Sequence, residues 1–143
     1  MREILFRGQT RRKGEKVRMD GSPVASNWVY GGVLKGIGDH SIIYQTEPEF
    51  HKFPVYTDTL GQFTGLCDKD GTKIFEGDIV KCVSKLNYVN MIVIFEDGEF
   101  RMVKCEDYKT YTTGNGYFSV RCFHKKVIGN IYDTPELLGG ESE

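Results

Sequence analysis

Apolar residues recur along this chain in short runs rather than at helical spacing. No window of 11 or more residues keeps an i, i+3, i+4, i+7 apolar pattern without a glycine, proline or β-branched interruption. The short runs are rich in Val, Ile, Tyr, Phe and Thr and are bounded by Gly, Asp and Asn, which is typical of strands. The pattern predicts strands at Ile4–Arg7, Asn27–Leu34, Ser41–Thr46, Gly61–Leu66, Lys73–Phe75, Asp78–Val83, Tyr88–Phe95, Phe100–Lys104, Tyr117–Phe123 and Val127–Tyr132.

The residues between these runs favour tight turns. Asp97-Gly98 separates two apolar runs and is a strong hairpin signal. Asp68-Lys69-Asp70-Gly71 is a second turn sequence, in which glycine can supply a positive φ. A one-turn helix is expected only near Asp58–Gly61 or Glu106–Lys109.

The predicted fold is mainly β. Short strands at roughly 8–15-residue spacing in residues 61–133 indicate a small, closed or nearly closed antiparallel barrel. We therefore divide the chain into an N-terminal β segment with a basic loop (1–60), a barrel (61–138) and a frayed tail (139–143). The N-terminal strands would form a second small sheet or extend the barrel. The expected core residues are Phe63, Leu66, Ile74, Ile79, Val80, Val93, Phe95, Val120, Ile128 and Ile131.

The charge of the chain is small but unevenly distributed. The 143 residues carry a formal net charge of −1, which excludes a globally basic nucleic-acid binder but not a local patch. Residues 1–35 sum to +5 and the remainder to −6. The positive charge is concentrated in a segment whose candidate nucleic-acid-binding residues are Arg7, Arg11, Arg12, Lys13, Lys16 and Arg18.

The N-terminus and the cysteine usage predict an intracellular, cytoplasmic protein without a membrane partner. No stretch approaches the ~20 apolar residues of a membrane span, and no signal-peptide apolar region of ~7–15 residues follows the N-terminus. The four cysteines contain no C-x-x-C pair, so we expect reduced thiols.

The cysteines, histidines and paired carboxylates of the sequence are better explained by structural roles than by metal binding or catalysis. Cys122 and His124 would share one face of a strand, but the spacings of a structural zinc site are missing. The carboxylates Asp68 and Asp70 lie in a turn, where Asp is favoured for local hydrogen bonds. A nucleophilic site needs a serine or cysteine beside a histidine and an orienting carboxylate, and nothing in the sequence points any of the histidines at such a nucleophile. We therefore predict no catalytic residue, no metal and no cofactor.

Three motifs in order resemble one known family. They are GQFTGLCDKDGTKIFEGDIV (Gly61–Val80), IVIFEDGEF (Ile92–Phe100) and VIGNIYDTPELL (Val127–Leu138), and the opening REILFRG (Arg2–Gly8) also matches. Together they resemble the YopX family of phage and prophage proteins. The resemblance implies a mainly β protein with an SH3-type barrel in its C-terminal part, encoded by a bacteriophage or prophage. It implies no enzymatic activity, catalytic residue or cofactor.

Two functions remain open at this stage. The first is a non-enzymatic phage accessory protein that binds a protein partner or forms a homo-oligomer, since short strands lend themselves to edge pairing. The alternative is a small-barrel nucleic-acid-binding protein, which would pair its N-terminal basic loop with aromatic faces. Lys125-Lys126 adds a second basic pair to that alternative.

Overall fold

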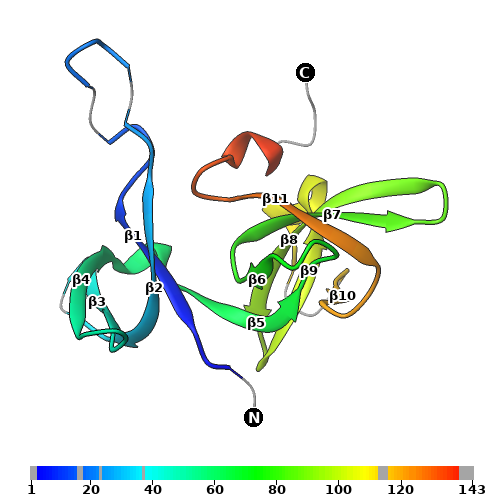
Figure 1. The fold of residues 1–143 in the computed structure, drawn as a ribbon. Coiled ribbons are helices and arrows are strands. Elements are labelled where there is room, and N and C mark those ends of the chain that lie inside the picture. Colours follow the sequence, from blue (N-terminus) through cyan, green and yellow to red (C-terminus); the bar gives the residue numbers. More distant parts are fainter. Residues whose placement is uncertain (1–2, 16–17, 23, 37, 113–115, 139–143) are drawn as a thin grey trace. The chain divides into compact units, whose positions relative to one another are not determined.

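A computed structural model of the chain describes residues 3–15, 18–22, 24–36, 38–112 and 116–138. These residues form two antiparallel sheets, and helix occurs among them only as short 3-10 turns, so the mainly β prediction is confirmed (Figure 1). The predicted tail, 139–143, lies outside the described residues. The strands and 3-10 turns are β1 (Phe6–Arg11), β2 (Asn27–Leu34), β3 (His40–Gln45), β4 (His51–Tyr56), η1 (Thr57–Thr59), β5 (Gly61–Cys67), β6 (Lys73–Phe75), β7 (Asp78–Ser84), β8 (Asn87–Glu96), β9 (Glu99–Lys104), η2 (Cys105–Thr110), β10 (Phe118–Ser119), β11 (His124–Asn130) and η3 (Pro135–Leu138).

Two strands depart clearly from the sequence prediction. β4 was not predicted, because Pro54 interrupts its apolar run; proline is tolerated there because β4 is an edge strand. The strand predicted over Tyr117–Phe123 is reduced to β10. The backbone turns after Ser119, whose carbonyl accepts a hydrogen bond from the Cys122 N–H at 2.9 Å.

The chain divides into two compact units, residues 1–63 and 64–143, and the division falls inside β5. The first unit contains strands in the order β4-β3-β2-β1-β5. Its sheet curls so that β1 and β4 approach each other. At Gly8 a Cβ atom would lie 2.9 Å from Cγ2 of the fully buried Val55, so the curl requires a residue without a side chain.

The sheet of the second unit has the order β10-β9-β8-β7-β11. The predicted hairpin between β8 and β9 is confirmed, because Glu96 pairs with Glu99 across Asp97 and Gly98. Both turn residues have positive φ, 52° and 80°, as a two-residue turn of this hand requires. The two sequential hairpins place β7, β8 and β9 side by side, and β11 returns to pair with β7.

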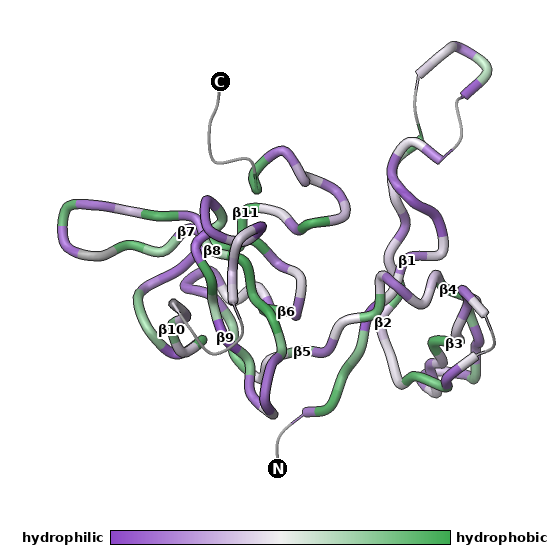
Figure 2. The backbone as a smooth tube through the Cα atoms, turned by 180° about the vertical axis from the view of Figure 1, so that it is seen from behind, coloured by the Kyte–Doolittle hydropathy of each residue, from purple (hydrophilic) through white to green (hydrophobic). Residues whose placement is uncertain are grey.

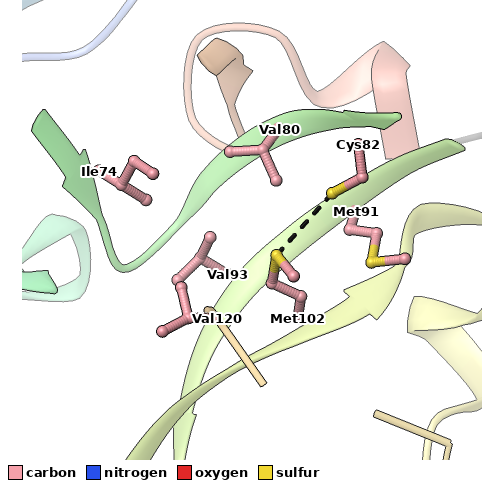
Figure 3. Close-up of a cluster of buried hydrophobic side chains, with 7 residues drawn as sticks. All are labelled: Ile74, Val80, Cys82, Met91, Val93, Met102 and Val120. Carbon is pink, nitrogen blue, oxygen red and sulfur yellow. Dashed lines mark hydrogen bonds between the residues drawn. The ribbon is translucent and has the colours of Figure 1, made fainter. Parts of the chain in front are cut away.

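The main buried cluster of the second unit lies on one face of this sheet, and Ile79, Ile92 and Val103 are buried on the other face. Inward positions alternate along β7 and β8, and the Sγ of Cys82 approaches the Sδ of Met102 at 3.9 Å (Figure 3). The buried cluster consists of Ile74, Val80, Cys82, Met91, Val93, Met102 and Val120. Of the predicted core residues, Leu66, Ile128 and Ile131 are only half-buried. Phe95 is half-exposed, because β8 carries it past the core to the hairpin turn, where its ring packs on Phe100.

Two buried carboxylates satisfy backbone groups at the margins of the second unit. Asp68 accepts hydrogen bonds from the N–H groups of Asp70, Thr72 and Val127, at 2.8–2.9 Å. Asp78 accepts one from the N–H of Phe75, at 2.8 Å. A buried N–H without an acceptor costs free energy, so these side chains stabilise the turns before β6 and β7.

We predict that Asp78→Ala lowers the free energy of unfolding by about 1–3 kcal/mol, because it removes the acceptor of a buried N–H. Urea unfolding at neutral pH measures the change. Asp107→Ala is the matched control, because Asp107 is exposed on η2 and should leave the midpoint unchanged. Equal midpoints for wild type and Asp78→Ala would contradict the assignment.

A second prediction concerns acid stability. Burial by itself raises the pKa of Asp68, but the three backbone N–H donors and Lys126 outweigh burial, so the pKa lies below its ordinary value of about 3.9. The carboxylate therefore contributes stability above pH 4, and the contribution is lost as the pH falls through the lowered pKa. Urea midpoints measured from pH 7 to pH 3 should fall less steeply in Asp68→Asn than in wild type. Parallel curves would refute the role.

Candidate binding surface

The first two predicted nucleic-acid-binding residues lie within the β1–β2 part of the first unit. Arg7 is buried, and its guanidinium lies 4.5 Å from the centre of the Trp28 ring. The Nε of Arg11 donates a hydrogen bond to the carbonyl of Ala25 at 2.9 Å. Burial removes Arg7 from the surface that a ligand would meet.

The remaining four predicted residues belong to the loop that follows β1. Arg12 donates hydrogen bonds to the Asp58 carboxylate at 3.0 and 3.3 Å, and its guanidinium lies 4.0 Å from the centre of the Tyr56 ring. Lys13 and Arg18 are exposed, and Lys16 lies outside the described residues. Arg12 is therefore already engaged by an anion and an aromatic ring of the protein.

A different group of cations surrounds a hollow in the second unit. This basic hollow has a volume of about 420 Å³. Its lining comes from the turn after β5, from β7 and from β11, and consists of Lys69, Lys81, Val83, His124, Lys125 and Lys126. A smaller hollow of about 210 Å³ shares Lys69, His124 and Lys125 with it. Three lysines and a histidine thus surround one recess, which the buried Lys125 also lines.

Strand register brings these residues together. Lys126 on β11 pairs with Lys81 on β7, and His124 pairs with Val83. Because side chains alternate across a strand, Lys81 and Val83 point to the same face of the sheet. This is the face opposite the core positions of Val80 and Cys82 at the end of β7.

The third segment of the hollow, the turn after β5, is attached to β11 by two backbone groups and the side chain of Asp68. The Lys69 N–H donates to the carbonyl of Lys125 at 3.4 Å, and Asp68 binds the N–H of Val127. These bonds attach the turn after β5 to the outer edge of β11. Lys69 is therefore fixed beside the lysines of β11 although it is far from them in sequence.

The lysines of the hollow differ in how far their charge is compensated. Lys69 and Lys81 form no ion pair within the described part of the chain. Lys126 binds Asp70 at 2.8 Å, and this hydrogen bond raises the pKa of its ammonium. Lys125 is buried, which lowers its pKa, and its Nζ donates to the carbonyl of Phe123 at 3.0 Å. Lys69 and Lys81 are therefore the cations most available to a ligand.

An aromatic ring adjoins the basic hollow on the β7–β8 hairpin, which projects from the rest of the unit (Figure 1). Tyr88 is 65% exposed, and the Nζ of Lys81 lies 4.1 Å from the centre of its ring. Val83 and Leu86 are also exposed on this hairpin, so apolar and charged positions follow each other along it (Figure 2). Polar and apolar ligand surface could both be accommodated here.

Four other kinds of feature bear on function in the described residues: a metal site, a reactive thiol, an uncompensated buried charge and a membrane-spanning helix. No three His, Cys, Asp or Glu side chains among them gather closely enough to hold a metal ion. Burial raises the pKa of Cys82 and of Cys105 to about 11, so both thiols stay protonated at neutral pH. The buried Arg101 is neutralised by Glu96 and Glu99, at 2.8 and 2.6 Å. In the described parts of the chain, no helix has the length and apolar character that a membrane span requires.

Sequence reasoning noticed only Lys125 and Lys126 of the basic hollow. Lys69 and Lys81 were missed, because they stand apart in a half of the chain whose net charge is negative. The available signal was period-two alternation on β7, which places Lys81 outward when Val80 and Cys82 are buried. The pairing of β7 with β11 could not be inferred from alternation.

Comparison with solved structures gives similar chains, one of which is described as "Crystal structure of protein EF1440 from Enterococcus faecalis". It is 20% identical to this chain, with a TM-score of 0.48, and the similarity covers 96% of this chain and 99% of that chain. No curated protein matches the chain.

A protein-family model also matches the sequence. The match extends over residues 15–139, which is most of the chain and includes both units and the basic hollow. The model is described as YopX protein. The resemblance read from the motifs is thereby confirmed, and the chain belongs to the YopX family.

Proposed function

We propose that this protein is a non-enzymatic binding protein that engages nucleic acid through the basic hollow of its second unit. The observation that carries the proposal is the convergence of Lys69, Lys81 and Lys126, together with His124, on one recess of about 420 Å³. Lysines that meet phosphate groups release counterions from nucleic acid, which is the main source of affinity for its backbone. Lys69 and Lys81 are the cations that would make these contacts most directly.

This nucleic-acid interface differs from the N-terminal basic loop that the sequence predicts. Burial of Arg7 and the ion pair of Arg12 with Asp58 leave fewer cations there for a ligand. In the second unit, by contrast, Lys81 and Lys126 stand on paired strands, and the turn that carries Lys69 is tied to β11 by Asp68. A site on strands is held more rigidly than one on a loop, which favours the basic hollow.

We also propose that the second unit is an SH3-like small barrel. The support is its strand order, in which β7, β8, β9 and β10 follow one another and β11 returns to β7. Small barrels of this kind bind extended ligands along strand faces. The basic hollow lies on such a face.

The biological setting follows from the family resemblance and is part of the proposal. YopX-like proteins are encoded by phages and prophages, so we place the protein in the cytoplasm of a bacterial host, as a phage accessory protein without catalytic residues or cofactor. A nucleic-acid ligand is compatible with that setting.

Protein interaction or self-assembly is the second candidate function. Exposed apolar side chains on the first unit favour it: Ile4, Tyr30, Leu34 and Phe50. Two strand edges count against simple edge pairing, since β4 contains Pro54 and the outer edge of β11 is occupied by the Asp68 turn. Sedimentation velocity tests this candidate, and a defined oligomer that dissociates in Phe50→Ser would support it.

The nucleic-acid proposal predicts a loss of affinity in Lys69→Gln/Lys81→Gln. Fluorescence anisotropy with labelled single-stranded and duplex DNA and RNA, at about 50 mM salt, measures binding. Each phosphate contact to a single strand contributes about 0.7 to the slope of log affinity against log salt, so losing two should reduce the slope by about 1.4.

The matched control is Lys52→Gln/Lys109→Gln, which removes the same charge from exposed lysines outside the hollow. It should bind with wild-type affinity and slope. The proposal fails if the wild-type protein binds none of the four nucleic acids at this salt concentration. It also fails if the control variant loses as much affinity as the variant of the hollow.

A further inference from the structure

We infer that the ligand is a single-stranded nucleic acid, one of whose bases stacks on the ring of Tyr88. The inference rests on the proposed function and goes further, because it assigns a residue to the bases rather than to the phosphates. Tyr88 is 65% exposed, so its ring serves no core. A large aromatic side chain held at the surface beside a cationic recess is the usual means by which proteins bind unpaired bases.

Strand register arranges the exposed face in two rows. In one row Tyr88, Val83 and His124 lie opposite one another across β8, β7 and β11. In the next row, two residues along the strands, lie Asn90, Lys81 and Lys126. Neighbouring strands are about 4.8 Å apart and the rows about 7 Å apart. A ring, an apolar group and an imidazole therefore run beside two ammonium groups.

The two rows suit the two sides of a single strand. Bases can lie against the row of Tyr88, Val83 and His124, while phosphates meet Lys81 and Lys126 in the next row. Lys69 at the rim of the hollow adds a further cation. Carboxylates near the site leave this charge largely intact, because Asp70 compensates only Lys126 and Asp68 is occupied by backbone donors.

Lys81 links the two rows. Its Nζ lies 4.1 Å from the centre of the Tyr88 ring, a cation–π contact that holds the ring on the sheet face. A base can then stack on the open face of the ring. In a duplex the bases are paired and stacked on one another, so only phosphates and base edges would be presented and the aromatic row would find no partner.

The experiment distinguishes the contribution of the bases to binding affinity from the contribution of the phosphates. Fluorescence anisotropy is measured with four labelled ligands of matched length or charge: an oligothymidine, an abasic strand with the same number of phosphates, a duplex, and heparin. Wild-type protein should bind oligothymidine more tightly than the abasic strand or the duplex. Tyr88→Ala should weaken oligothymidine binding roughly 5- to 150-fold and leave the abasic strand unaffected.

Two variants make the result specific. Tyr88→Phe keeps the ring and should retain most of the affinity of wild type. Tyr30→Ala removes another exposed tyrosine, on β2 of the first unit, and should bind as wild type does. Urea unfolding of each variant verifies that it is folded, and Tyr88→Leu, which keeps an apolar side chain but no ring, takes the place of Tyr88→Ala if that variant does not fold.

The outcomes distinguish this inference from the proposed function. If the abasic strand and the duplex bind as tightly as oligothymidine, and Tyr88→Ala binds as wild type does, stacking is overturned while backbone binding stands. If heparin alone binds, the site takes polyanions without bases and the inference is likewise overturned. If the wild-type protein binds none of the ligands, the proposed function fails, and with it this inference.

Discussion

The side chain of Asp68 joins two segments of the second unit that are 59 positions apart in sequence. One carboxylate oxygen closes the turn after β5 by accepting the N–H groups of Asp70 and Thr72, and the other accepts the N–H of Val127 on β11. This clamp acts together with the hydrogen bond from the Lys69 N–H to the Lys125 carbonyl and with the Lys126–Asp70 ion pair to hold Lys69 beside β11. The basic hollow therefore depends on an acidic residue, which positions cations through backbone hydrogen bonds rather than by opposing their charge.

Much of the fold could be predicted from the sequence, because the residues of a strand and of its flanking turns form a recognisable local pattern. The limits of β2 and β6 follow directly from apolar runs bounded by turn residues, and Asp97-Gly98 specifies its hairpin through a backbone conformation that few residues adopt. The exceptions have physical causes. Proline conceals the edge strand β4, and alternation cannot tell that Phe95 lies beyond the end of the core.

The candidate site was much less predictable, since tertiary structure assembles it. A run of basic residues in the N-terminal segment attracts attention, yet Arg7 packs on Trp28 and Arg12 binds Asp58. The lysines that do face a common recess come from three separated segments, and Lys81 is a single cation among apolar neighbours on β7. Charged residues that are close in sequence are therefore not always the ones that lie together in the fold, because strand register decides which residues are neighbours.

The continuity of β5 has a consequence for how this chain can evolve. Its first residues pair with β1, Gly61 with Arg7 and Gln62 with Phe6, whereas Thr64 already binds the carbonyl of Ile74 in the second unit. No linker separates the units, and one uninterrupted strand supplies hydrogen bonds to both. An exchange of either half would therefore have to restore this strand, because its residues bind partners in both units.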